Sequence, residues 1–559
     1  MNRIRKKLRS WKLLTLIGVL AALAIAVAQP MVRVQAQSES AGVEDVAVGT
    51  RILASARGTA GPATLVTPDD IALADAAIAA AHTLISDKPF MPTDDPSAYA
   101  AAKNLAIAAA ATGKPGADPT LSPQPLAPPT IRGINFAGLS QAGAFPPDTH
   151  GATGPSHFVE VTNITMRAFN KAGGTLCTFT LAALHGAAEF IFDPRVVYDQ
   201  TWNRWVFVAT RRSTSANDPV RRFFIAVSTT GNPCGSYFRN TFTFGGGAFN
   251  NGDWLDYPGL GMNQDAILIT GNIFDTPTGA FKFATALGIA KARLYNGLGF
   301  FVPMFTTSAA TLQPPIVYDQ NKDAYFLAAN NLTHLHLFRG NNMSNADEAT
   351  FVLQALVDVP NYAVPPNARQ VGTAQRLDSL DRRFVNASTQ IADSLWNVHT
   401  IALGSFPAPR FYEVDTEGVG ANTVKQQGFF FESATSDDWN ASITANASRE
   451  AFVTWNSTNA ISANLALRHQ ARMRISGRQP ADALGVIGAG SIVFTSAVAL
   501  TGNPSNTAFV QRWGDYSAVS LDPQTAAGCA ANRRAWAVNE VINNANTWGS
   551  RIARIGFCG

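Results

Sequence analysis

From residue 131 to the end of the chain, apolar and polar positions form short runs, and no segment keeps the 3.6-residue period of a helix. Runs such as WVFVA at 205–209 and FFIAVS at 223–228 are bounded by Gly, Pro, Asn or Asp, as strands usually are. The pattern predicts an all-β domain over residues 131–559, built from strands joined by tight turns.

One phrase occurs twice in this domain: PRVVYDQ at 194–200 returns as PPIVYDQ at 314–320. The following runs, WVFVA at 205–209 and YFLAA at 325–329, also correspond. We read seven units of strand, turn and strand, which begin near Asp148, Asp193, Asp256, Pro314, Asp381, Trp439 and Asp515. Repeats on this scale predict a β-propeller of seven four-stranded blades. Six or eight blades are alternatives, and a β-sandwich with a second β domain is the runner-up fold.

The final unit shows three strands only. We expect its fourth strand to come from residues 131–139, at the other end of the domain, which would close the ring and remove an open sheet edge.

The region before the domain is rich in alanine. Thr67 caps a predicted helix that runs to about residue 86, and a second helix is expected over about 97–112. We therefore predict a helical extension over 37–113, poorly ordered over 37–66, and a proline-rich linker over 114–130. The helical extension could be a spacer, a pro-region or a cap on the domain, and we rank the spacer first.

The N-terminus resembles a signal peptide. Six basic residues precede an apolar run over 13–28, and Val34-Gln35-Ala36 offers a cleavage site, so residues 1–36 are predicted to be removed on export. An uncleaved membrane anchor is the alternative, and it would favour a cell-surface adhesion module. No later run is apolar enough to cross a membrane, so we expect a secreted, extracellular or periplasmic, monomeric protein.

Four cysteines allow three pairings, and in an exported chain they favour disulfides over a metal site. We favour Cys177–Cys234 and Cys529–Cys558, the pairs closest in sequence. The net charge of +4 is small for 559 residues and no basic stripe occurs, which argues against a nucleic-acid partner.

The open ends of the hairpins should meet on one face. This would gather Asp148, Asp193, Asp256 and Asp515, whose carboxylates could hold a structural Ca²⁺, together with the amides of Asn163, Asn272 and Asn539 as ligand-binding groups. The alternative is that each aspartate only caps its own turn.

Three arginines from different units, Arg195, Arg382 and Arg512, could converge on the same face and clamp a carboxylate. With Glu160, Glu540 or Tyr516 nearby, such an arrangement would suit a sialidase-like hydrolase. The alternative is that each arginine pairs with a neighbouring aspartate, such as Arg512 with Asp515.

Several motifs together resemble a group of exported bacterial proteins whose opening motif is PPDT-x-GAVG. The matching segments are PPDTHGATGP at 146–155, DPRVVYD at 193–199, WLDYP at 254–258, RWGDYS at 512–517 and WGSRI at 548–552. Members of this group are similar to sialidase/BNR-like propellers in predicted fold and mostly lack an assigned activity. The resemblance implies a propeller and export, and it supplies no catalytic residues.

The sequence predicts a protein that binds an extracellular glycan or protein at the channel face. A glycoside hydrolase or lyase that uses the channel carboxylates is the alternative. Carboxylates that share a cation would favour binding, and paired carboxylates with one held protonated by burial would favour the enzyme.

Overall fold

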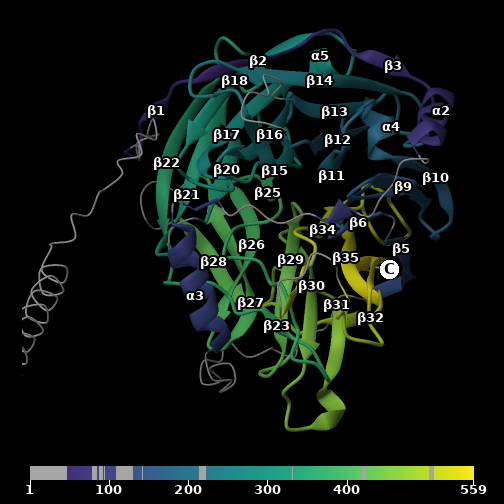
Figure 1. Ribbon diagram of the computed structural model, residues 1–559, viewed down its shortest axis with the longest axis vertical. Helices are drawn as coiled ribbons and strands as arrows, with labels where there is room; N and C mark the ends of the chain where they lie inside the picture. Colours follow the sequence, from purple (N-terminus) through teal and green to yellow (C-terminus); the bar gives the residue numbers. More distant parts are fainter. Residues whose placement is uncertain are drawn as a thin grey trace, which may run out of the picture. The chain divides into compact units, whose positions relative to one another are not determined.

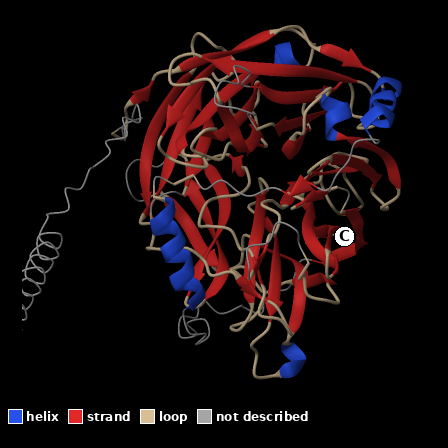
Figure 2. Cartoon of the chain, in the orientation of Figure 1, coloured by secondary structure: helices blue, strands red, loops and turns tan. Residues whose placement is uncertain are grey.

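The computed structural model describes residues 47–78, 85–86, 92–93, 95–108, 130–141, 143–212, 222–329, 332–417, 423–502 and 509–558. Strands make up nearly all of its regular structure (Figure 2). The all-β prediction is confirmed. The predicted signal peptide, residues 1–36, and nearly all of the predicted linker lie outside the described residues.

The strands follow one another as antiparallel meanders (Figure 1). The first three meanders comprise β7 (His150–Thr153), β8 (His157–Thr162), β9 (Thr165–Asn170) and β10 (Thr175–Thr180); β11 (Phe192–Asp199), β12 (Arg204–Thr210), β13 (Arg222–Ser228) and β14 (Tyr237–Gly245); and β15 (Asp253–Met262), β16 (Ala266–Asp275), β17 (Phe281–Ala290) and β18 (Phe300–Thr307). The next comprises β19 (Pro315–Val317), β20 (Ala324–Ala328), β21 (His334–Asn341) and β22 (Thr350–Asp358). Strand β19 belongs to this meander by sequence order, although it pairs in parallel with β15 and with the next first strand.

Two further meanders comprise β25 (Ser388–Ile391), β26 (Ser394–Leu403), β27 (Phe406–Asp415) and β28 (Val424–Phe429); and β29 (Asp437–Ala445), β30 (Ala451–Asn459), β31 (His469–Arg478) and β32 (Ser491–Thr495). The last comprises β34 (Ala518–Leu521), β35 (Arg534–Asn544) and β36 (Thr547–Gly556). Its fourth strand is β5 (Thr130–Ser140), which pairs with β36 through Ile552 and Phe136. The prediction that residues from the start of the domain complete the last sheet is therefore confirmed.

The first strands of the meanders contact one another in the order β7, β11, β15, β19, β25, β29 and β34, and β34 contacts β7 again. Apolar clusters fill the spaces between neighbouring sheets. At the seam between the last sheet and the first, the rings of Phe158 and Trp536 lie 5.9 Å apart. Burial of apolar side chains on both faces of each sheet is the main stabilising contribution to such an arrangement.

The N-terminal region departs from the sequence prediction. Residues 51–66 were expected to be poorly ordered, and this is wrong, because they form strands on the outer edges of the sheets: β1 (Arg51–Ile52) on β22, β2 (Ala56–Ala60) between β14 and β18, and β3 (Thr64–Val66) on β14. The pairing supplies backbone hydrogen bonds that local propensity does not reveal. Residues 51–66 are thus part of the sheets and not a spacer.

The helices are short. They are α2 (Pro68–Ile78), α3 (Pro96–Ala108), α4 (Leu181–His185), α5 (Lys291–Leu294) and the 3₁₀ turn η2 (Leu465–Leu467). As predicted, Thr67 caps α2: its hydroxyl accepts a hydrogen bond from the Asp70 amide, and the Asp70 carboxylate accepts one from the Thr67 amide. No described helix has the length and apolar character that a membrane span requires. Short strands complete the structure: β4 (Ile85–Ser86), β6 (Ala144–Phe145), β23 (Ala368–Arg369), β24 (Arg376–Leu377) and β33 (Val510–Gln511).

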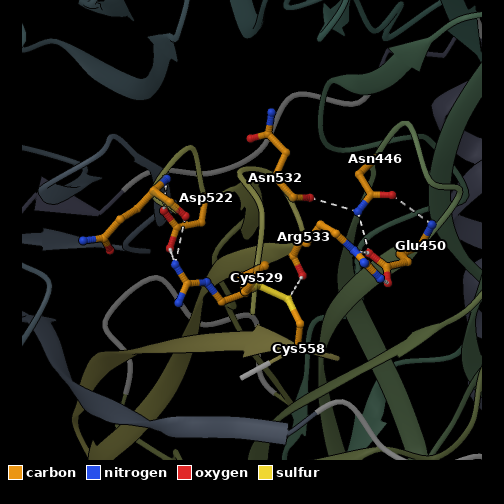
Figure 3. Close-up of a disulfide and its surroundings, with 9 residues drawn as sticks. Asn446, Glu450, Asp522, Cys529, Asn532, Arg533 and Cys558 are labelled. Atoms are coloured by element: carbon orange, nitrogen blue, oxygen red, sulfur yellow. Dashed lines mark hydrogen bonds and ion pairs between the residues drawn. A yellow bond between two sulfur atoms is a disulfide. The ribbon is translucent and has the colours of Figure 1, made fainter. Parts of the chain in front are cut away.

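Both predicted disulfides, Cys177–Cys234 and Cys529–Cys558, are present. The second ties the loop before β35 to the end of the chain, and its surroundings are drawn in Figure 3. Beside it, Arg533 forms an ion pair with Glu450, and the Asn446 side chain donates to the Asn532 carbonyl at 2.9 Å. The loop is therefore attached to the β29–β30 turn of the neighbouring sheet. Disulfides are typical of oxidising compartments, which is consistent with a secreted protein.

Candidate functional site

Residues with left-handed backbone lie at or near the entries of the first strands. Their φ values are 47° for Asp148, 53° for Asp193, 56° for Tyr257, 53° for Thr311, 59° for Leu380 and 50° for Asn440. This conformation costs side-chain-bearing residues about 1 kcal/mol each, so the surrounding contacts must hold them in place. The left-handed conformation recurs at the strand entries, where the predicted aspartates and amides also lie.

The aspartates predicted from sequence are brought together. The Asp148 carboxylate accepts hydrogen bonds from the Asn163 side-chain amide at 2.6 Å and from the Asp515 backbone N–H at 2.8 Å. It thereby links the first sheet to the approach of the last. All four aspartates are buried, with exposed fractions of 2% for Asp148, 5% for Asp193, 8% for Asp256 and 5% for Asp515.

Asp193 lies at the centre of these carboxylates. Its Oδ2 accepts a hydrogen bond from the hydroxyl of the fully buried Tyr516 at 2.8 Å. Burial raises the pKa of Asp193 well above its ordinary value, and the nearby carboxylates of Asp148, Asp256 and Asp515 raise the pKa further. Asp193 therefore resists ionisation.

Asp515 is the second perturbed acid. Burial raises its pKa to about 7, although its ion pair with Arg512 acts in the opposite direction. Glu540 is buried beside it: Oε2 accepts the Gly514 N–H at 2.6 Å, and burial raises the pKa of this carboxyl well above its usual range. We call Asp148, Asp193, Asp256, Asp515 and Glu540 the central carboxylates. Glu160 lies apart from them, bonded to the Leu139 amide.

The three predicted arginines have different surroundings. Arg195 is buried and donates to the carbonyls of Pro258 at 2.8 Å and Val385 at 2.9 Å, and to Asn386 Oδ1 at 2.9 Å. Its guanidinium lies 3.3 Å from the centroid of the Tyr516 ring. Arg195 therefore connects several first-strand entries across the centre, with all of its nitrogens bonded to protein.

Arg512 is buried as well, with an exposed fraction of 7%. Arg512 pairs with Asp515, as the alternative interpretation had it, and also approaches Asp378, with 3.9 Å between nitrogen and oxygen. Arg382 is half-buried. Its neighbour Arg383, which sequence reasoning missed, points inward: it pairs with Asp381 at 2.7 Å and lies 4.4 Å from the Tyr257 ring centroid. Arg382 and Arg383 lie in an irregular segment, so no periodic signal indicates which of the two arginines faces the centre.

The three predicted amides hold backbone in place. Asn163 accepts the Asp193 N–H at 2.8 Å, and Asn272 accepts the Thr311 N–H at 2.7 Å, so each fixes the left-handed residue that opens the next unit. Asn539 donates to the Asn440 carbonyl at 3.1 Å. These contacts explain how the left-handed residues are stabilised. They also engage the atoms for which a ligand-binding role was predicted.

A small pocket opens beside the central carboxylates. It has a volume of about 40 Å³, and its lining comprises Pro92, Thr93, Tyr99, Ala310, Thr311, Ala329, Asp381, Arg382 and Arg383. We call the group Thr311, Asp381, Arg382 and Arg383 the mouth. Residues of the N-terminal region complete the lining. A cap was ranked below a spacer as the role of this region, and none of its residues was predicted to belong to the site.

The fit of Ca²⁺ to the central carboxylates can be judged from their hydrogen bonds. Asp148 and Asp193 already accept hydrogen bonds from an amide and a hydroxyl, and Asp515 is ion-paired with a guanidinium. Among the described residues there is no group of three or more His, Cys, Asp or Glu that could hold a metal ion. In this arrangement the carboxylates do not form a Ca²⁺ shell, and the Ca²⁺ site remains a prediction.

Comparison with known proteins gives no family. No family model matches the chain, and no curated protein does. Solved structures with some likeness include the subtype N10 neuraminidase-like protein of a little yellow-shouldered bat isolate from Guatemala, at 9% identity and a TM-score of 0.32 over 63% of this chain and 97% of that one. An exo-β-1,3-galactanase from Phanerochaete chrysosporium matches at 10% identity and a TM-score of 0.29, over 76% of this chain and 98% of that one.

Trypanosoma rangeli sialidase matches at 9% identity and a TM-score of 0.31, over 65% of this chain and 54% of that one. Likeness at such TM-scores carries no argument about the activity of this chain.

Proposed function

We propose that the chain is a seven-bladed β-propeller that binds an extracellular ligand, a glycan or a protein, at the mouth. The closed order of contacts among the first strands supports the propeller interpretation, since each first strand then begins one blade around a common axis. Ligand sites of such folds form where loops from several blades meet.

The observation that carries the proposal is the mixed chemistry of the mouth. Thr311, Asp381 and Arg382 contribute a hydroxyl, a carboxylate and a guanidinium to the pocket lining, and they come from two separate units. Sugar hydroxyls and polar protein side chains need both donors and acceptors, and this combination provides both. The buried Asp381–Arg383 pair, which is part of this lining, fixes the geometry, and this lowers the entropy cost of binding.

The alternative, a glycoside hydrolase, is favoured by one observation: burial raises the pKa of Asp515 to about 7, which suits a general acid at neutral pH. The sialidase-like roles of Arg195 and Tyr516 are less suitable. The guanidinium nitrogens of Arg195 already donate hydrogen bonds to protein acceptors, and Tyr516 is fully buried, so neither could reach a substrate without rearrangement.

The test is a glycan-array screen of the full chain, followed by titration calorimetry with the best glycan. We expect Arg382→Ala to weaken binding at least tenfold, and Arg167→Ala, on β9 away from the mouth, to leave it unchanged. Equal binding by both variants would refute the mouth as the ligand site. Glycan hydrolysis that Asp515→Asn abolishes would establish the enzyme instead.

A structural Ca²⁺ on Asp148, Asp193, Asp256 and Asp515 is tested separately by thermal unfolding with Ca²⁺ and with chelator. A bound ion raises the midpoint by mass action, and Asp193→Ala should remove the increase. An unchanged midpoint would mean that the carboxylates act without a cation.

A further inference from the structure

Helix α3 lies against the mouth through one side. Tyr99 lines the pocket, and Lys103 follows four residues later on the same helical face. Thr93, just before the helix, lines the pocket as well. Thr93 and α3 therefore cover one side of the opening beside the central carboxylates.

Lys103 places its ammonium group among acceptors. Nζ donates to the Leu380 carbonyl and to Ser379 Oγ, the latter at 3.3 Å. The carboxylates of Asp378 and Asp381 lie near enough to favour the protonated form, although burial lowers the pKa of Lys103 to about 8. A carbonyl, a hydroxyl and two carboxylates are well suited to an ammonium group with three donors.

The segment that receives Lys103 is connected directly to the centre. Asp378 approaches Arg512, and Asp381 pairs with Arg383. Leu380, between them, has a φ of 59° and packs with Tyr257 and Tyr516. The acceptors around Lys103 are therefore held in part by contacts with residues that surround the central carboxylates.

The rest of α3 is weakly attached. None of its 13 residues is fully buried, and the side chain of Leu105 is 73% exposed. An isolated helix of this length is marginal in water, and apolar burial contributes little here. Tyr99, in the pocket lining, and Lys103, through its hydrogen bonds, attach α3 to the mouth.

We propose that α3 is an internal lid and that Lys103 occupies a subsite for a primary ammonium group, which a ligand carrying such a group fills when α3 moves away. The inference deepens the proposed function, because it assigns a cationic group to the ligand that the mouth binds. An amino sugar or an exposed lysine side chain carries that group.

Chemical complementation tests the subsite. Lys103→Ala removes the internal ammonium group and leaves space, whereas Lys103→Met keeps most of the side-chain volume without the charge. Propylammonium is the probe, propanol is the uncharged control, and binding is measured by ligand-observed NMR on the full chain. We expect Lys103→Ala to bind propylammonium at least tenfold more tightly than the unchanged protein does, and not to bind propanol.

The matched variants should behave differently. Lys103→Met should not bind propylammonium, because its side chain fills the space, and Lys425→Ala, which removes a lysine paired with Asp393, should behave as the unchanged protein does. Equal affinity of the unchanged protein and Lys103→Ala would overturn the proposal. If Lys103→Ala does not fold, Tyr99→Ala, which loosens α3 and retains Lys103, must increase propylammonium affinity for the proposal to stand. These results are independent of glycan binding, so failure of the glycan screen and failure of the subsite are distinguishable.

Discussion

The two copies of the repeated phrase have nearly the same sequence and different structures. In the first copy, residues 194–200 lie mainly in β11, an eight-residue strand paired in antiparallel with β12. In the second, residues 314–320 contribute only the three residues of β19, which pair in parallel with β15 and β25. Prolines 314 and 315 lack the N–H groups that an antiparallel ladder requires. The positions that the two copies share therefore determine the turn after each strand. The positions that differ between them determine the role of each copy.

The aspartate that the two copies share has the same local contact in both. Asp199 accepts the Thr201 N–H at 3.0 Å, and Asp319 accepts the Asn321 N–H at 2.9 Å, so each aspartate closes its own turn. The unmatched part differs in chemistry. Arg195, which spans the centre, corresponds to Pro315, and the buried acid Asp193 corresponds to the amide Gln313.

The largest effect is expected from Arg195→Met. The change leaves the Pro258 and Val385 carbonyls and the Asn386 side chain without their donor in a buried setting. Hydrogen bonds to charged groups contribute about 1.5–3 kcal/mol each, and they are not additive, so we expect a loss of about 3–5 kcal/mol in the free energy of unfolding. Urea denaturation measures it.

The matched change in the second copy is Pro315→Ala. It should cost less than about 1 kcal/mol, because Pro315 makes no side-chain hydrogen bond that the change could remove. Equal losses in the two variants would contradict the central role assigned to Arg195.

Several features of the fold could be predicted from the sequence. The alternating pattern predicted the strands, proximity in the chain predicted both disulfides, and the missing fourth strand of the last unit predicted that residues 131–139 complete its sheet. The meeting of Asp148, Asp193, Asp256 and Asp515 was also expected from the geometry of hairpins.

The contacts around the site could not be predicted in the same way. The position of α3 over the mouth and the strands formed by residues 51–66 depend on partners far away in sequence. Arg382 was chosen over Arg383 because single-residue placement in an irregular segment has no periodic signal. The amides of Asn163 and Asn272 look free in the sequence, yet they are required by the left-handed backbone of Asp193 and Thr311.

A second pair of changes tests the shared aspartates. Asp199 also forms a buried ion pair with Lys291 at 2.7 Å and accepts the Tyr295 hydroxyl at 2.7 Å, whereas Asp319 accepts only backbone N–H groups among the contacts described, from Asn321 and Ala392. Asp199→Ala should therefore cost about 3 kcal/mol, because it leaves a buried ammonium group unpaired.

Asp319→Ala should cost about 1 kcal/mol, the usual effect of losing a turn or cap acceptor. Thermal and urea unfolding of the two variants provide the measurement. A larger loss for Asp319→Ala than for Asp199→Ala would show that the turn, and not the ion pair, governs stability in both copies.

The most specific effect concerns pH. The raised pKa of Asp193 means that the folded state holds this proton more tightly than the unfolded chain does. The associated stability is present below the ordinary aspartate pKa of 3.8 and is lost as pH rises through the folded-state value. In the unchanged protein, the free energy of unfolding should therefore decline by up to about 1.4 kcal/mol per pH unit above pH ~4 because of this group. Asp193→Asn should remove this decline, and its side-chain oxygen still accepts the Tyr516 hydroxyl.

The second copy allows the reverse change. Gln313 is fully buried and donates to the Phe384 carbonyl at 3.1 Å, so Gln313→Glu places a carboxyl group beside an acceptor in a buried setting. Only the protonated acid can replace the amide donor, and the variant should gain the pH dependence that Asp193→Asn loses. Urea denaturation at several pH values between 4 and 8 compares them. If both variants follow the pH profile of the unchanged protein, the acid in one copy and the amide in the other are equivalent, and the distinction between the two copies lies in Arg195 alone.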